Sequence, residues 1–183
     1  MDGIYFFSAK DIQIVVVYYF FDFGFCSGDI FHIGSTSIQT IGYAKPIIDI
    51  LIVVKDIAKV DYFNEKMKDL GYDPRGENGI SCRRYFTKGK EKRTHHVHVY
   101  QEGNGNIEKH LSFKAYLIQH PDEAKKYGEL KNKLAKKYPD DTYKYQKEKE
   151  AFVNGIVEKA LKWSSKEILF KYANHKLYIK FFN

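Results

Sequence analysis

The 183-residue sequence is 44% hydrophobic and 29% charged, a balance that excludes a disordered chain and is typical of one soluble globular domain. Its formal net charge of +7 at pH 7 suits anionic partners such as nucleotides, coenzymes or nucleic acid, although solvated lysines on helix faces are the preferred explanation of that charge. Cys26 and Cys82 show neither metal-binding nor CxxC spacing, which favours a reduced intracellular protein and gives no support to a cysteine zinc site.

The chain opens on an apolar run at residues 12–21 that charged residues bracket on both sides. A run of about ten residues is too short to span a bilayer. The acidic start Met1-Asp2-Gly3 does not fit a signal peptide. The Val and Tyr content favours a buried β-strand instead. We therefore expect a cytoplasmic protein without membrane association.

A turn and a strand follow that together suggest an anion site. Residues 29–33 predict a strand leading into Gly34-Ser35-Thr36-Ser37, a turn whose backbone N–H groups and hydroxyls can approach an anion closely. A short helix predicted at 35–42 would add its N-terminal dipole. Residues 47–54 predict a buried central strand with one ionisable residue, Asp49. Because a buried carboxylate needs compensation, Asp49 is either a metal ligand or part of a structural hydrogen-bond network.

The middle of the chain predicts one helix and a hairpin. The helix spans residues 56–70, with an aspartate at its start and a glycine after its end. Strands are expected at 81–88 and 94–101, and the glycine-containing link at 89–92 suits a hairpin between them.

The second of these strands carries clustered histidines. Alternation places His96 and His98 on one face and Val97 and Val99 on the other. If this strand neighbours that of Asp49, the carboxylate and both imidazoles would form a mixed metal site, whose nitrogen ligands favour manganese or zinc over magnesium. The imidazoles would otherwise contact phosphates, act as a general base, or form a surface cluster without function.

Several cations are candidates for neutralising phosphate charge, namely Lys45, Arg83, Arg84 and Lys149. Alternation places Arg83 and Arg84 on opposite faces of their strand, so only one of the two needs to face a site. Lys149 lies in a predicted helix at 142–163, where a solvated lysine is an equally good interpretation. Two further helices are expected near 107–118 and from residue 121 onward.

These stretches also carry a family resemblance. The motifs are His-Ile-Gly-Ser-Thr-Ser at 32–37, Lys-Pro-Ile-Ile-Asp-Ile at 45–50, Leu-Gly-Tyr at 70–72, Arg-Gly-Glu-Asn-Gly-Ile at 75–80, Arg-Arg-Tyr-Phe at 83–86, Arg-Thr-His-His-Val-His-Val-Tyr at 93–100, His-Leu-x-Phe at 110–113 and Tyr-x-x-x-Lys-x-x-Phe at 145–152. In this order they resemble the GrpB family of the nucleotidyltransferase superfamily, which has a DNA-polymerase-beta-like core.

The resemblance implies an α+β fold, a nucleotidyltransferase-like mixed β-sheet packed with helices and followed by a C-terminal helical region. It divides the chain into a divergent segment at 1–28, the family domain at 29–163 and an extension at 164–183. The first segment lacks the polar amphipathic helix, with its Pro-x-Trp-like motif, that usually opens members of the family.

The resemblance also implies metal-dependent nucleotidyl transfer from a nucleoside triphosphate to an unknown acceptor. Asp49, His96 and His98 would be the catalytic and metal-binding residues, with magnesium or manganese, or else zinc, as the metal. The residues expected to hold the nucleotide are Gly34, Ser35, Thr36, Ser37, Lys45, Arg84 and Lys149.

One departure keeps a second function open. The superfamily strand carries two alternating carboxylates, whereas this strand offers Ile47, Asp49 and Leu51. The alternative is a non-catalytic module of the same fold that binds a nucleotide or coenzyme A, since related domains occur fused to dephospho-CoA kinase. Nucleic acid is not an expected partner, because no helix-turn-helix, aromatic RNA-binding motif or basic stripe is present. The sequence does not predict the oligomeric state.

Overall fold

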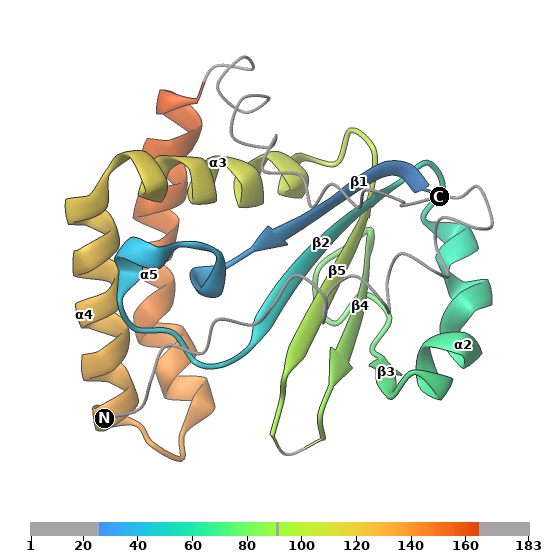
Figure 1. Cartoon of the computed structure of the whole chain (residues 1–183), viewed down its shortest axis with the longest axis horizontal. Helices are drawn as coiled ribbons and strands as arrows, with labels where there is room; N and C mark the ends of the chain where they lie inside the picture. Colours follow the sequence, from blue (N-terminus) through green and yellow to red (C-terminus); the bar gives the residue numbers. More distant parts are fainter. Residues whose placement is uncertain (1–25, 91, 165–183) are drawn as a thin grey trace, which may run out of the picture. The chain divides into compact units, whose positions relative to one another are not determined.

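The computed structural model describes residues 26–90 and 92–164 (Figure 1). Two compact units divide these residues. One, here called the sheet unit, contains residues 26–33 and 47–107, and the other, the helical unit, contains residues 34–46 and 108–164. The strand predicted at 12–21 and the extension beyond Ser164 lie outside the described residues.

Five strands form one sheet in the described part of the chain, in the order β1-β2-β5-β4-β3 (Figure 1). Their bounds are β1 Cys26–Ile33, β2 Ile48–Val54, β3 Tyr72–Pro74, β4 Arg83–Lys88 and β5 His95–Gln101. β2 and β5 run parallel, and every other neighbouring pair is antiparallel. The predicted α+β class with a mixed sheet is therefore confirmed. β2 is an interior strand, although β5 holds the centre of the sheet.

One face of the sheet forms the main core of this unit. Ile48, Ile50 and Ile52 of β2 are fully buried beside Val97 and Val99 of β5. The segment predicted as one helix at 56–70 begins as the 3-10 turn η3 (Ala58–Phe63) and continues as α2 (Asn64–Asp69). Its buried Val60 and Met67 belong to the same apolar cluster. Since these residues cover this face, the polar residues that alternate with them along β2 and β5 lie on the opposite face.

The hairpin predicted between the strands at 81–88 and 94–101 is present. β4 and β5 pair antiparallel from Lys88 opposite His95 to Arg83 opposite Tyr100. Gly89 opens the link with φ of +84°, and a Cβ there would lie 2.2 Å from the Lys92 carbonyl oxygen. Only glycine fits such a close approach.

The helical unit contains two short turns and the C-terminal helices. The turns η1 (Ser35–Ser37) and η2 (Gln39–Ile41) replace the single helix expected at 35–42, because Ile38 between them is extended, with φ −130° and ψ 99°, and is buried. The helices are α3 (Gly105–Gln119), α4 (Pro121–Lys137) and α5 (Thr142–Trp163), which confirm the predicted C-terminal helical region. None of the described helices is long and apolar enough to cross a membrane.

Candidate functional site

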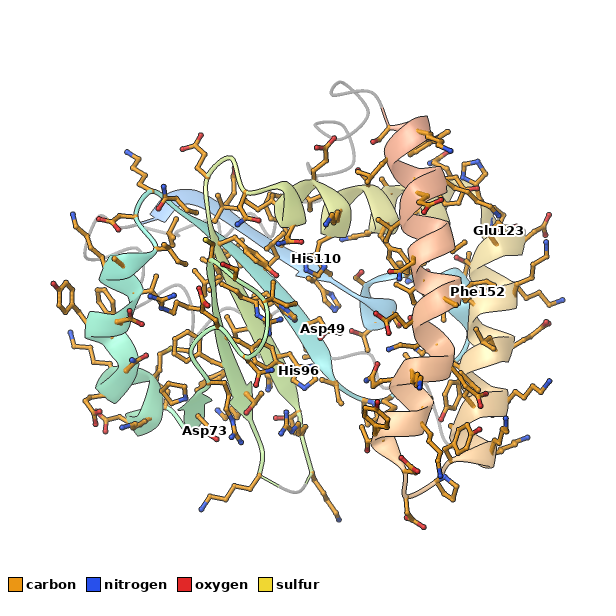
Figure 2. All side chains as sticks on the ribbon, turned by 180° about the vertical axis from the view of Figure 1, so that it is seen from behind. Asp49, Asp73, His96, His110, Glu123 and Phe152 are labelled. Atoms are coloured by element: carbon orange, nitrogen blue, oxygen red, sulfur yellow. The ribbon has the colours of Figure 1, made fainter. Side chains whose placement is uncertain are left out.

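Asp49 and two imidazoles meet on one face of the sheet unit. The Asp49 Oδ1 lies 3.1 Å from His96 Nδ1 and 3.8 Å from His98 Nε2, and Figure 2 shows Asp49 and His96 side by side. Asp49 is the one residue of β2 that is not buried. Its side chain is 28% exposed, compared with 21% for His96 and 14% for His98. The three groups therefore form a cluster that is partly open to solvent.

Strand pairing explains this cluster. In the parallel pairing of β2 with β5, Asp49 stands opposite His96 and Leu51 stands opposite His98. Val97 and Val99 point into the apolar core on the other face. The adjacency of the two strands, on which the mixed-site hypothesis depended, is thus present.

The carboxylate of Asp49 is ionised in this setting. Burial of the carboxyl raises its pKa, but hydrogen bonds and charge interactions with His96 and His98 outweigh this effect and hold the pKa of Asp49 far below its ordinary value. An ionised carboxylate only accepts hydrogen bonds, so Nδ1 of His96 is the donor. The other ring nitrogen of His96, Nε2, is buried and has no hydrogen-bond partner within the described residues.

β4 places two further side chains on the same face of the sheet, next to the histidines. Tyr85 is paired with His98 and Thr87 with His96. The Tyr85 ring centroid lies 5.0 Å from that of His98 and 5.6 Å from that of His96. Burial, together with the Asp49 charge, raises the pKa of the Tyr85 phenol. Sequence reasoning did not select Tyr85, although alternation along β4 already placed it on the same face as Arg83.

The structure does not bring Arg84 to this cluster. Arg84 faces the other side of β4, where its Nε and Nη2 donate to both carboxylate oxygens of Asp61 at 2.6 and 2.7 Å. The arginine on the histidine face is Arg83, which is buried and donates to the backbone carbonyls of Glu77 and Asn78 at 3.1 and 2.9 Å. The arginine predicted to bind phosphate, Arg84, thus lies on the face away from Asp49, and its phosphate-binding role stays a prediction.

The remaining predicted phosphate contacts belong to the helical unit. Lys45 and Lys149 both lie against the ring of Tyr145, with Nζ 4.6 and 5.4 Å from its centroid. The turn predicted to hold phosphates is closed by the Ser37 hydroxyl, which donates to the Gly34 carbonyl at 2.7 Å. Gly34 has φ of +69°, a conformation that favours glycine. The phosphate-binding roles of Gly34, Ser35, Thr36, Ser37, Lys45 and Lys149 remain predictions.

The candidate site supplies only some of the ligands that a divalent metal needs. No three His, Cys, Asp or Glu side chains within residues 26–90 and 92–164 form a ready-made metal cage. Asp49 Oδ1 would supply one oxygen, and His96 Nδ1 would supply a nitrogen only in place of its hydrogen bond to Asp49. Such mixed donors suit manganese or zinc. Phosphate oxygens or water would complete the shell, as is usual for metals bound with nucleotides.

Comparisons with known proteins agree on one family. The family model described as GrpB protein matches residues 7–159. The chain is 39% identical to the glutamate-rich protein GrpB of Alkalihalophilus pseudofirmus, over 70% of this chain and 76% of that protein. It is 52% identical to the UPF0157 protein YqkA of Bacillus subtilis over 73% of this chain, and it spans only 39% of that relative's length.

A solved structure is also similar. The crystal structure of the conserved protein GrpB from Enterococcus faecalis aligns with a TM-score of 0.72 at 41% identity, covering 84% of this chain and 88% of that one. None of these names states a substrate or a cofactor.

Proposed function

This chain belongs to the GrpB family, and from that premise we propose that it is a nucleotidyltransferase-like enzyme. The proposed reaction moves a nucleoside monophosphate from a nucleoside triphosphate to an acceptor hydroxyl with the help of a divalent metal. The observation that carries the proposal is the ionised Asp49 carboxylate, facing His96 at 3.1 Å and His98 at 3.8 Å on a partly exposed sheet face. Ionisable groups with perturbed pKa values cluster at functional sites, and the geometry of Asp49 and the two imidazoles supports such a site here.

Asp49, with one or both imidazoles, would hold the metal. A divalent cation at this position supplies Lewis-acid polarisation of phosphoryl oxygens. The ionised state of Asp49 is the form that ligates a metal, and the hydrogen bonds that lower its pKa keep it in that form at neutral pH.

The imidazoles have a second role in this proposal. An imidazole that does not ligate the metal would accept the proton of the acceptor hydroxyl as general base. The acceptor oxygen then bonds to the α-phosphorus, the bond from that phosphorus to the bridging oxygen breaks, and pyrophosphate leaves. In this type of reaction the protein contributes mainly by positioning and by electrostatic stabilisation.

The lysines of the helical unit would bind the triphosphate. Lys45 and Lys149 bring two ammonium groups to one tyrosine ring, an arrangement suited to a polyvalent anion. Gly34 and Ser35 would add backbone and hydroxyl contacts to phosphate. Replacing both lysines with methionine tests this role, because it would raise the KM for the triphosphate more than it lowers kcat.

The decisive experiment measures pyrophosphate release from nucleoside triphosphates with manganese, magnesium or zinc, in the full chain and in Asp49→Asn. We expect loss of turnover in Asp49→Asn. The matched control is Asp73→Asn, since Asp73 is a carboxylate of the same sheet whose partner is the exposed Arg75 at 2.8 Å. If Asp49→Asn released pyrophosphate as fast as the control, the catalytic proposal would be wrong.

A specific observation favours the second candidate, a nucleotide- or coenzyme A-binding module without turnover. β2 supplies a single carboxylate, whereas two-metal phosphoryl transfer ordinarily uses more. Calorimetric titration with ATP and with coenzyme A, in the presence and absence of metal, separates the candidates. Tight metal-dependent binding without pyrophosphate release would support the binding module.

A further inference from the structure

We propose that Tyr85 is a positioning residue that keeps the His96 and His98 rings turned toward Asp49. Its catalytic importance rests on the proposed function, but its effect on the two rings does not. Tyr85 would touch neither substrate nor metal, and it would act through the two histidines.

Strand register places Tyr85 against both imidazoles. Tyr85 stands directly opposite His98 in the β4–β5 pairing, and His96 is its diagonal neighbour on the same face. Ring centroids lie 5.0 Å apart for Tyr85 and His98 and 5.6 Å apart for Tyr85 and His96, with interplanar angles of 56° and 51°. These distances are those of direct aromatic contact. One phenol ring therefore limits the rotation of both imidazoles.

Tyr85 itself is held from several sides. Its backbone N–H donates to the Gly76 carbonyl at 2.9 Å, and its carbonyl accepts from the Arg75 N–H at 2.8 Å. The guanidinium carbon of Arg83 lies 4.4 Å from the ring centroid. Tyr85 as a residue is 8% exposed. A side chain held in this way can restrict the rotation of the rings that pack against it.

The histidines are thus restrained on two sides. Asp49 attracts Nδ1 of His96 and faces Nε2 of His98, while Tyr85 packs against both rings. The two imidazoles present different nitrogens to one carboxylate oxygen. Each imidazole must therefore adopt its own rotation about χ2. We infer that the carboxylate alone does not fix both rotations, and that packing against the Tyr85 ring does. Hydrogen-bonding partners outside the ligands orient metal-binding histidines in general, and the Tyr85 ring would do so by packing.

The other face of the sheet supplies a matched control. Tyr72 packs against His95 at a centroid distance of 6.1 Å, lies under the Lys88 ammonium at 5.2 Å, and is 2% exposed. Tyr72 therefore contacts a histidine and a cation, as Tyr85 does, but on the sheet face opposite Asp49. Loss of its ring removes a similar packing contribution without touching the candidate site.

The test compares Tyr85→Leu, Tyr85→Met, Tyr85→Phe and Tyr72→Leu in the full chain, without metal, by two-dimensional ¹H–¹⁵N spectra of the histidine rings. We expect the unaltered protein and Tyr85→Phe to show His96 as one tautomer with the proton on Nδ1. Tyr85→Leu and Tyr85→Met would show averaged tautomers, because a His96 ring that can turn away from Asp49 loses the acceptor that selects the proton on Nδ1. Tyr72→Leu would keep the single tautomer. Titration with zinc alone should then show affinity about 10–100-fold weaker in the leucine and methionine variants.

The outcomes test the positioning role of Tyr85 and the proposed metal binding separately. A single Nδ1–H tautomer of His96 in both the leucine and the methionine variant would overturn the positioning role. Averaging in Tyr72→Leu would also overturn it, because the cause would then be general loosening of the sheet. Failure of every protein to bind zinc would count against the proposed metal alone, since the ring spectra are recorded without it.

Discussion

Gly128 of α4 is a position at which one added methyl group should be strongly destabilising. A Cβ on Gly128 would lie 1.8 Å from the carbonyl oxygen of Ile41 and 2.9 Å from its carbonyl carbon. The obstacle is backbone in η2, so it cannot rotate away as a side chain would. Gly128→Ala therefore forces η2 off α4, and η2 follows the predicted phosphate-binding turn directly in the chain.

The expected magnitude follows from two opposing terms. Alanine gains about 1 kcal/mol over glycine in a helix interior, while overpacking costs about 1–3 kcal/mol and sometimes more. Because the contact is so short, we place the cost at or above the top of that range and expect a net loss of about 2–4 kcal/mol. For a chain of this size, such a loss lowers the Tm by about 5–10 °C.

Gly155 provides the control with the opposite sign. It lies within α5, and a Cβ there would meet no heavy atom within 4 Å. Gly155→Ala should therefore stabilise the protein by about 0.5–1 kcal/mol through helix propensity alone. Urea and thermal unfolding of both variants, followed by circular dichroism, measure the two effects. Equal stability of Gly128→Ala and the unaltered protein would refute the packing of η2 on α4.

Other predictions concern two ion pairs. Arg84→Ala should cost only about 0.5–1 kcal/mol, because the pair with Asp61 is partly exposed, and it should leave nucleotide binding unchanged in calorimetry, since Arg84 faces away from Asp49. The pKa of Glu123 is held below its ordinary value chiefly by the hydrogen bond from Lys159 of α5 at 2.8 Å. A depressed carboxyl pKa stabilises the fold above the pKa of the unfolded chain, and this contribution disappears as the pH falls through the folded value. The stability difference between the unaltered protein and Glu123→Gln, measured by urea unfolding, should therefore be present at neutral pH and shrink as the pH falls through the folded pKa of Glu123.

Two differences from the expected elements have a common cause. The helix expected at 35–42 is interrupted because Ile38 leaves the helical conformation and becomes buried. β3 was not predicted, since its three residues, Tyr72–Pro74, carry too little pattern and depend on pairing with β4. In both places tertiary packing outweighs local preference.

Local sequence was sufficient wherever the physical cause is local. Alternation in β5 separates His96 and His98 from the core valines, Pro121 begins α4, and the Asp141 side chain caps α5 by accepting from the Lys144 N–H. These features depend on side-chain period and on groups a few residues apart.

Only the tertiary structure decided which residues meet at the candidate site. Asp49 and His96 are 47 positions apart in the chain, and they face one another because β2 and β5 pair in parallel at one particular register. A slip of one residue would turn the histidines into the core. The same register selects Arg83 over Arg84 and brings Tyr85 to both imidazoles. Pairing between distant strands depends on burial summed over the whole sheet, so no single stretch of sequence encodes it.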